Sequence, residues 1–284
     1  MSRSLDMPAP RAFGWDLKAL ESSAFEIHQR DNGQFCVVLA HSLLRGVRAE
    51  MIHWWFMNFT NMKVRLRDVP GYEEQVVPAY LLWHPVDHLS AELTGKLGPG
   101  NTPKPGCAIR IREAMQYDTY GWKYPVDSAL KVFYVGDDGW AMGKTIPMVG
   151  AVMMLRIHYK DIFDGHTHLG VQYHYEVVIG ASGASAVARL INKNLTSKFG
   201  PEFFTAWQRH NVIEVGTFEN FLPALFAQKH SLEALEYARE MNPTFKDAAP
   251  QRPLDQTLFE QRIHGYRNTD RPHGFQNYEA PSFL

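Results

Sequence analysis

The sequence has few cysteines and lacks any long uncharged apolar run. Only Cys36 and Cys107 are present among 284 residues, without Cys-x-x-Cys spacing, so we expect no disulfide framework and a reducing, cytoplasmic location. No window approaches the roughly eighteen uncharged apolar residues of a membrane helix. Residues 1–11 contain no apolar signal-peptide core. We therefore expect neither entry into the secretory pathway through a signal peptide nor a membrane span.

An excess of either charge is also missing. The 29 lysines and arginines nearly balance the 30 aspartates and glutamates, which gives a formal net charge of -1. Such a chain has no field that would gather nucleic acid or an anionic membrane, so neither is an expected partner. By contrast, the chain is 45% hydrophobic and 13% aromatic, enough for a sizeable core, and it has 13 histidines. Chemistry is therefore expected where histidines fall among apolar residues.

Three regions differ in composition. Residues 1–32 carry scattered prolines and a weakly amphipathic stretch at 17–27, which predicts an N-terminal extension containing a helix. Residues 33–241 hold most of the periodic apolar pattern and form the expected main domain. Residues 242–284 are rich in proline and poor in aliphatic side chains, which is typical of an irregular C-terminal tail.

The pattern within the main domain predicts an α+β fold of the helix-grip type. An antiparallel sheet would curve around a long C-terminal helix, with a pocket between them. The expected strands lie at residues 34–44, 80–83, 90–94, 107–117, 129–135, 139–146, 149–160 and 169–179. The expected helices lie at residues 47–59, 184–199, 203–215 and 231–241, and the apolar stretch 218–226 is expected to pack on the domain.

The stretch 80–88, Tyr-Leu-Leu-Trp-His-Pro-Val-Asp-His, carries a dense set of candidate functional side chains. Its first four residues read as a strand that ends before Pro85, which cannot donate to a sheet ladder. Tyr80 and His84 would share one face of that strand, so an imidazole reaches the pocket beside a phenol. Two further polar side chains, Asp87 and His88, follow directly.

The strand at 107–117 places one carboxylate on an apolar face. Period-two alternation sets Glu113 in line with Ile109, Ile111 and Met115. An ionised carboxylate in that position costs several kcal/mol unless it is paired or ligates a cation. Glu113 is therefore protonated, paired with a buried Arg or Lys, or bound to a metal.

A third candidate histidine lies in the hairpin formed by residues 149–160 and 169–179. If the connecting loop folds symmetrically, sheet parity places His158 on the same face as Tyr173 and Tyr175. The neighbouring histidines also have respectable ligand spacing and remain open alternatives. These are His166, His168 and His174.

The long helix at 203–215 supplies the last candidate. His210 has Glu214 one turn later, where a carboxylate can accept from an imidazole nitrogen. In a helix-grip fold, His210 would face the cavity into which the sheet residues point. Three imidazoles and one carboxylate suit zinc best, with other divalent transition metals as competitors. The predicted metal ligands are His84, Glu113, His158 and His210.

Several of these motifs together resemble the diacetylphloroglucinol hydrolase and phloretin hydrolase family. They are the 80–88 stretch, the aromatic helix around residues 54–56, the triplet Ile-His-Tyr at 157–159, and His-Asn-Val-Ile-Glu-Val-Gly-Thr-Phe-Glu-Asn-Phe-Leu-Pro at 210–223. The resemblance covers residues 34–226. It implies a Bet v 1/START-like fold and a zinc ion held by His, Glu, His and His in chain order. It also implies hydrolysis of the carbon–carbon bond between an aromatic ring and an acyl group.

Carried onto this chain, the resemblance implies the same four zinc ligands and a pocket tyrosine, Tyr173. His88 is a second candidate for moving a proton to the leaving ring carbon. Asp87, Tyr80 and Trp55 are expected to contact the substrate, an aromatic ketone or β-diketone. The competing hypotheses are a carrier of hydrophobic ligands without chemistry, and a metal-free polyketide cyclase or dehydratase of the same fold. The oligomeric state is left open, with a homodimer as one alternative.

Overall fold

The computed structural model describes residues 13, 15, 17–67, 69, 72–183, 185–230 and 235–238. Within these residues, an 8-stranded sheet has the order β1-β2-β10-β9-β8-β7-β6-β5, and all of its neighbouring strands are antiparallel. Its strands are β1 Ser23–Gln29, β2 Phe35–His41, β5 His88–Thr94, β6 Ala108–Ala114, β7 Pro125–Gly136, β8 Gly139–Ile146, β9 Gly150–Asp164 and β10 Thr167–Ile179.

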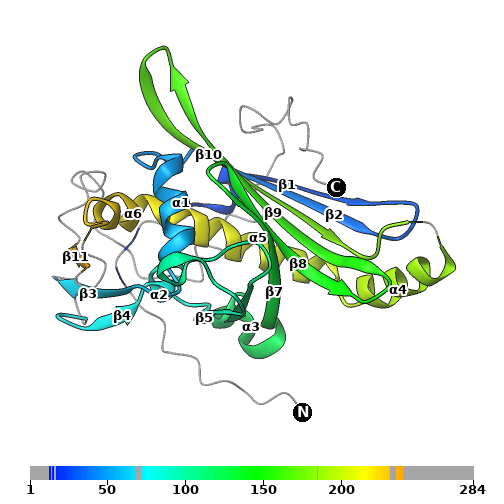
Figure 1. The fold of residues 1–284 in the computed structure, drawn as a ribbon. Helices are drawn as coiled ribbons and strands as arrows, with labels where there is room; N and C mark the ends of the chain where they lie inside the picture. The colour runs from blue at the N-terminus through cyan, green and yellow to red at the C-terminus, as the bar shows by residue number, and fades with distance from the viewer. Residues whose placement is uncertain are drawn as a thin grey trace.

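The long helix α5, Pro201–Gly216, runs across this sheet, between α4, Ala186–Thr196, and α6, Phe218–Phe226 (Figure 1). Pro201 occupies the first turn of α5, where a missing N–H costs no helical hydrogen bond. The expected helix-grip class, an antiparallel sheet around a long helix late in the chain, is confirmed. One cluster of buried side chains joins helix and sheet: Val37, Val177, Ile179 and Phe204.

Among the remaining elements, α1, Ala49–Asn58, packs against α6 and β9, whereas η3, Gly121–Lys123, lies at the first turn of α5, where Lys123 pairs with Glu202. Trp54 of helix α1 meets Phe226 of α6 edge to face, and Phe56 stacks on Tyr159 of β9. A 3-stranded sheet has the order β11-β3-β4. No helix in the described residues is long and apolar enough to cross a membrane. The bounds are η1 Leu20–Ser22, α1 Ala49–Asn58, β3 Lys63–Arg67, β4 Val76–Pro78, α2 Tyr80–Trp83, η2 Pro99–Asn101, α3 Tyr117–Tyr120, η3 Gly121–Lys123 and β11 Glu236–Ala238.

Two expected elements have the wrong type. The helix predicted at 17–27 is replaced by η1 and strand β1, because Ser23–Gln29 pairs along its whole length with β2. The strand predicted at 80–83 is the one-turn helix α2, in which the Leu82 N–H donates to the Ala79 carbonyl. An apolar run of four residues fits either state, and tertiary packing decides between them.

The helix predicted at 231–241 falls mostly outside the described residues. Its described part contains strand β11, which pairs in parallel with β3, so the prediction is wrong there. The predicted tail at 242–284 lies outside the described residues. The division into extension, main domain and tail stays a prediction, although β1 joins part of the expected extension to the main sheet.

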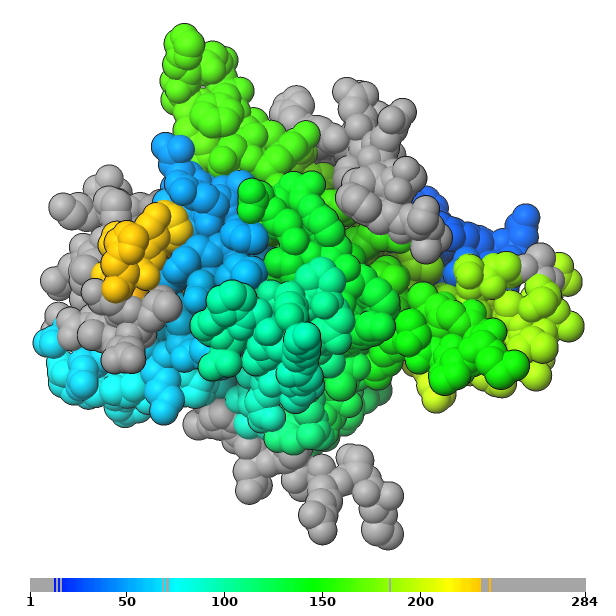
Figure 2. All heavy atoms as spheres, in the orientation of Figure 1, coloured from blue at the N-terminus to red at the C-terminus, as the bar shows by residue number. Residues whose placement is uncertain are grey.

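The β9–β10 hairpin, whose tip stands out from the surface in Figure 2, has a register that the symmetric-loop prediction missed. At the hairpin tip, Thr167 pairs with Asp164. If this register continued along both strands, His158 would lie opposite Tyr173. A bulge between His168 and Gly170 adds one residue to β10, and beyond it His158 faces His174. Because side chains alternate between faces, this single residue moves His158 to the face opposite Tyr173.

We expect His174 to make folding sensitive to acid. Burial, His158 and Lys160 lower the pKa of His174 to about 4, below the usual 6.5, so the unfolded chain binds a proton first as pH falls. Stability present above pH 6.5 should therefore be lost between pH 6.5 and pH 4, by on the order of 3 kcal/mol. Urea titrations of His174→Gln should show a smaller loss over this range.

The exposed histidine His28 gives the matched control, and His28→Gln should follow the wild-type pH profile. Identical pH profiles for wild type and His174→Gln would contradict the assignment of this acid sensitivity to His174.

Candidate functional site

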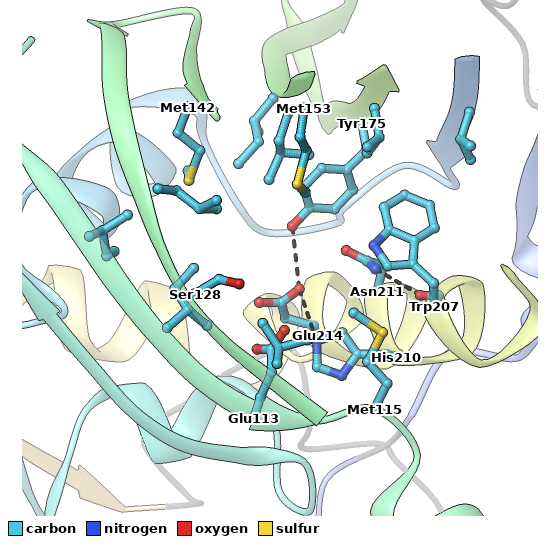
Figure 3. A pocket seen from close by; sticks show the side chains of 18 of the residues that line it. Glu113, Met115, Ser128, Met142, Met153, Tyr175, Trp207, His210, Asn211 and Glu214 are labelled. Atoms are coloured by element: carbon cyan, nitrogen blue, oxygen red, sulfur yellow. Dashed lines mark hydrogen bonds and ion pairs between the residues drawn. The ribbon is translucent and has the colours of Figure 1, made fainter. Parts of the chain in front are cut away.

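A cavity of about 330 Å³ lies between the sheet and helix α5. Its wall is mainly apolar, with sheet residues such as Met142 and Met153 on one side and Trp207 of α5 on the other. Ionisable side chains gather at one end, where His210 and Glu214 of the helix meet Glu113 of the sheet (Figure 3). This end, with the residues buried directly behind it, is called the acidic end below.

Three regular elements and one turn bring the acidic end together. Strand pairing sets His88, the first residue of β5, opposite Glu113 of β6. Helical spacing sets His210 and Glu214 one turn apart on α5. Asp87 lies in the turn between α2 and β5, fully buried. The predicted placement of Glu113 on the apolar pocket face is confirmed.

His88 has a defined role for each ring nitrogen. Its Nδ1 lies 2.9 Å from the carbonyl oxygen of Tyr80, which can only accept, so Nδ1 carries a proton. Burial lowers the pKa of His88 to about 3, which keeps the ring neutral and places its lone pair on Nε2. Nε2 lies 3.5 Å from Glu113 Oε2 and 3.5 Å from Glu214 Oε1.

His210 is oriented in the same way by a carboxylate. Its Nδ1 donates to Asp87 Oδ2 at 2.8 Å, so its Nε2 faces the cavity, 3.7 Å from Glu113 Oε2 and 3.9 Å from Glu214 Oε2. Asp87 also accepts the backbone N–H groups of Gln116 and Tyr117, at 2.7 and 3.0 Å. A histidine that donates Nδ1–H to a carboxylate or a carbonyl is the usual arrangement of a metal-binding imidazole.

The buried carboxylates of the acidic end require a compensating positive charge. Burial opposes ionisation of Asp87, but nearby His84 and the hydrogen bond from His210 outweigh it and hold the pKa of Asp87 well below its usual value. Burial raises the pKa of Glu214 to about 7. Burial would lower the pKa of His210, but Glu113 and Asp87 raise it to about 9. Protons on His210 and Glu214, or a divalent cation in their place, would balance these carboxylates.

His84, one of the predicted ligands, has its nitrogens otherwise engaged. Its Nδ1 accepts the backbone N–H groups of Val86 and Asp87, at 3.2 and 3.0 Å, so the proton of the neutral ring is on Nε2. That Nε2 lies 3.4 Å from Asp87 Oδ2, and the ring stacks on His210 with centroids 4.7 Å apart. In this arrangement His84 supports Asp87 and His210 from behind. Ligand atoms of His84, Asp87 and His210 also lie within 4.8 Å of one another, so His84 as a metal ligand stays a prediction.

The structure does not bring His158 to the acidic end. The parity prediction that set His158 beside Tyr173 is wrong, because His158 pairs with His174 across the hairpin while Tyr159 pairs with Tyr173. The cavity-lining residues of β9, including Ile157, lie on the other face of that strand. The competitor His168 donates Nε2–H to Asp161 Oδ1 at 2.8 Å, on the hairpin.

The other predicted contacts divide into two groups. Tyr80 lines the cavity, donates to Glu113 Oε2 at 2.8 Å, and stacks on His88 with centroids 3.9 Å apart. Trp55 and Tyr173 are fully buried but are not among the described residues that line the cavity. The lining tyrosine of β10 is Tyr175, which donates to Glu214 Oε2 at 3.3 Å.

Sequence reasoning gave Glu214 only a supporting role. It anticipated a carboxylate that fixes the tautomer of His210, but Asp87 does this, and Glu214 faces the cavity. Period-two alternation offered the signal for Tyr175, which shares a strand face with Tyr173 two residues earlier. Which of the two tyrosines reaches the cavity is set by how far the cavity extends along the strand, and alternation carries no information about this.

No protein-family model and no curated protein sequence matches the chain. Among solved structures, protein Ms6760 from Mycobacterium smegmatis is 11% identical, over 68% of this chain and 96% of its own, with a TM-score of 0.35. Ara h 8.0201 is 10% identical over 69% and 100%, with a TM-score of 0.32. Human STARD10 is 12% identical over 84% and 95%, with a TM-score of 0.33. At these scores the likenesses carry no argument, and the fold assignment rests on the sheet order and on helix α5.

We expect Asp87→Asn to release His210 and to destabilise the protein. The neutral amide cannot accept all three hydrogen bonds, from His210, Gln116 and Tyr117, as the carboxylate does. Buried donors therefore lose their partners, which lowers the free energy of unfolding by about 2 kcal/mol or more. The pKa of His210 should fall below about 9, because one of the groups that raises it is gone. NMR titration of the His210 ring and urea unfolding measure these two effects.

Asp127→Asn is the matched control, because Asp127 is an exposed carboxylate that pairs with Arg110. If Asp87→Asn were as stable as Asp127→Asn and left the His210 titration unchanged, Asp87 would not be the group that holds His210.

Proposed function

We propose that this chain is a metal-dependent hydrolase, with zinc as the best-fitting ion, that cleaves an acyl group from a phenolic ring. One observation supports the site above all: ligand atoms of His88, Glu113 and His210 lie within 4.8 Å of one another, in buried positions. Glu214 Oε1 lies 3.5 Å from His88 Nε2 and offers a fourth donor. Two imidazoles and two carboxylates are a donor set that zinc accepts, with manganese and iron as competitors.

The reaction class comes from the sequence resemblance, and the cavity is consistent with it. An apolar space of about 330 Å³ suits a small aromatic ketone, with its carbonyl at the acidic end. Bound there, zinc would supply Lewis acidity to a substrate oxygen and would lower the pKa of water to about 7. Glu113 and Glu214 would hold the ion, while Tyr80 and Asp87 would fix the positions of Glu113 and His210.

Hydrolysis needs one further proton transfer. Water adds to the acyl carbon, the carbon–carbon bond breaks with its electron pair on the ring carbon, and that carbon takes a proton. The products are a carboxylic acid and the deacylated ring. We assign the proton transfer to Tyr175 Oη, which lines the cavity beside Glu214, in place of the predicted Tyr173. Burial raises the pKa of Tyr175 well above its usual value, so the phenol is protonated.

A carrier of small hydrophobic ligands is the second candidate, and the mainly apolar wall of the cavity favours it. The acidic end favours chemistry, because a carrier gains nothing from burying carboxylates and histidines that cost several kcal/mol to desolvate. Metal content and turnover separate the two candidates.

Metal analysis tests the site. Purified wild-type protein should hold about one zinc ion per chain after dialysis. His88→Ala and His210→Ala should lose most of it, because each removes an imidazole whose Nε2 faces the carboxylates. His158→Ala should keep wild-type zinc content, since His158 lies on the opposite face of β9. Circular dichroism confirms that each variant is folded before its metal is counted.

Wild-type protein that is folded but binds no divalent metal would refute the metal site and favour the carrier. Equal zinc content in His88→Ala and His158→Ala would place the metal elsewhere.

Turnover of monoacetylphloroglucinol tests the reaction. Tyr175→Phe should reduce kcat on the order of a hundredfold or more while zinc content stays unchanged, because the variant lacks only the phenolic hydroxyl to which the proton transfer is assigned. Tyr134→Phe is the matched control, because Tyr134 donates a hydrogen bond to Asp138 in the β7–β8 turn. This variant should have the wild-type kcat. A zinc-loaded wild type without turnover of any acylphenol would contradict the proposed reaction but not the metal site.

A further inference from the structure

Helix α4 and the β8–β9 turn expose four large apolar side chains at one end of the molecule. Val187 and Leu190 of α4 are each 61% exposed, and Met148 of the turn is fully exposed. Ile146, the last residue of β8, is the fourth. Figures 1 and 2 show α4 beside this turn. Exposed apolar side chains that gather in this way mark a surface that contacts another apolar phase.

Packing on the sheet fixes the orientation of α4. Its inner face carries Ala188, Ile191 and Leu195. These side chains pack in one cluster with Val149 of the β8–β9 turn and Val152 of β9. Val187 and its neighbours on the outer side of the helix therefore point away from the sheet.

The two flanks of α4 differ in character. Arg189 and Lys193, four residues apart, share the flank that lines a groove with the β1–β2 turn, where Asp31 is the one acidic lining residue. Val187 and Leu190 share the other flank. That flank lies on the side of the β8–β9 turn, because β2 and β9 pair with opposite edges of β10, which α4 follows directly. Apolar and basic side chains thus lie next to each other on the outward surface.

Charge is unevenly distributed along the chain, although its net value of -1 argued against an anionic partner. Residues 139–155 and 177–201, which contain the β8–β9 turn and α4, include no aspartate or glutamate. Arg189, Lys193 and Lys198 are exposed and make no ion pair with any carboxylate in the described ranges. This end of the molecule therefore attracts an anionic surface, whatever the charge of the whole chain.

The cavity also reaches this end. Met153 and Ile179 pair at the adjoining ends of β9 and β10, and both line the cavity. Phe199 and Phe203, which follow α4 directly, line it as well and are only partly buried. A hydrophobic ligand dissolved in a lipid phase at this end would meet the apolar wall of the cavity.

We propose that α4 and the β8–β9 turn dock on the surface of an anionic lipid membrane. Val187, Leu190 and Met148 enter the boundary between headgroups and acyl chains, while Arg189 and Lys193 contact the anionic headgroups. A second copy of this chain fits the surface less well. A two-fold contact would set Arg189 and Lys193 of both copies together, and α4 has no carboxylate to pair with them. Docking does not depend on the proposed hydrolase function.

Vesicle sedimentation tests the docking. At low salt, wild-type protein should bind vesicles of equal parts phosphatidylcholine and phosphatidylglycerol, and should bind pure phosphatidylcholine vesicles at least about tenfold more weakly. Lys193→Glu should weaken binding to the anionic vesicles at least about fivefold, because it reverses one basic contact. Leu190→Ser should weaken that binding about fivefold or more, because its large exposed apolar surface is no longer there to leave water.

Two matched controls change other parts of the surface. Lys96→Glu makes the same change of charge at an exposed lysine in the β5–β6 connection. Phe163→Ser removes an exposed apolar side chain at the tip of the β9–β10 hairpin. Both variants should bind the anionic vesicles as the wild type does. Circular dichroism confirms that every variant is folded before its binding is measured.

The proposal is overturned if the wild type does not bind the anionic vesicles, or binds both kinds of vesicle equally. It is also overturned if Lys193→Glu weakens binding no more than Lys96→Glu, or Leu190→Ser no more than Phe163→Ser. A wild-type dimer in sedimentation equilibrium that Leu190→Ser dissociates would assign the surface to a second copy of the chain instead. Metal content and turnover are measured without vesicles, so failure of the hydrolase is distinguishable from failure of docking.

Discussion

The buried carboxylate of Asp87 connects three separate parts of the chain. It accepts hydrogen bonds from His210 of helix α5 and from the backbone N–H groups of Gln116 and Tyr117 after β6. Asp87 itself lies in the turn before β5. A fully buried carboxylate such as Asp87 is tolerated only when hydrogen-bond donors replace the water molecules that would otherwise solvate it. Gln116 also adopts a left-handed backbone with φ 53°, which its hydrogen bond to Asp87 offsets. Turn, sheet and helix must therefore be in place together before the acidic end exists.

The resulting distribution of charge gives the cavity a direction. The carboxylates of the acidic end attract a cation and repel an anionic ligand group. Tyr80 and Tyr175 remain protonated because burial raises their pKa values well above the usual range. Each phenol then donates to one carboxylate, to Glu113 and to Glu214.

Periodicity predicted the helix-grip class and placed Glu113 and His210 correctly, because long alternating or helical patterns record which face is buried. It failed at short or irregular features. Four apolar residues at 80–83 fit a strand as well as a helix, and one bulge residue in β10 reversed the face of His158. Neither feature leaves a repeating signal, so both follow from contacts between distant segments.

The roles of His84 and His88 show why proximity alone does not identify a ligand. The two rings lie 5.5 Å apart and are almost fully buried, and sequence favoured the first. Backbone N–H groups occupy Nδ1 of His84, which forces the proton onto Nε2. A backbone carbonyl occupies Nδ1 of His88, which forces the lone pair onto Nε2. Whether a buried histidine can ligate is thus set by the group that holds its other nitrogen, and that group is fixed by the fold of the turn.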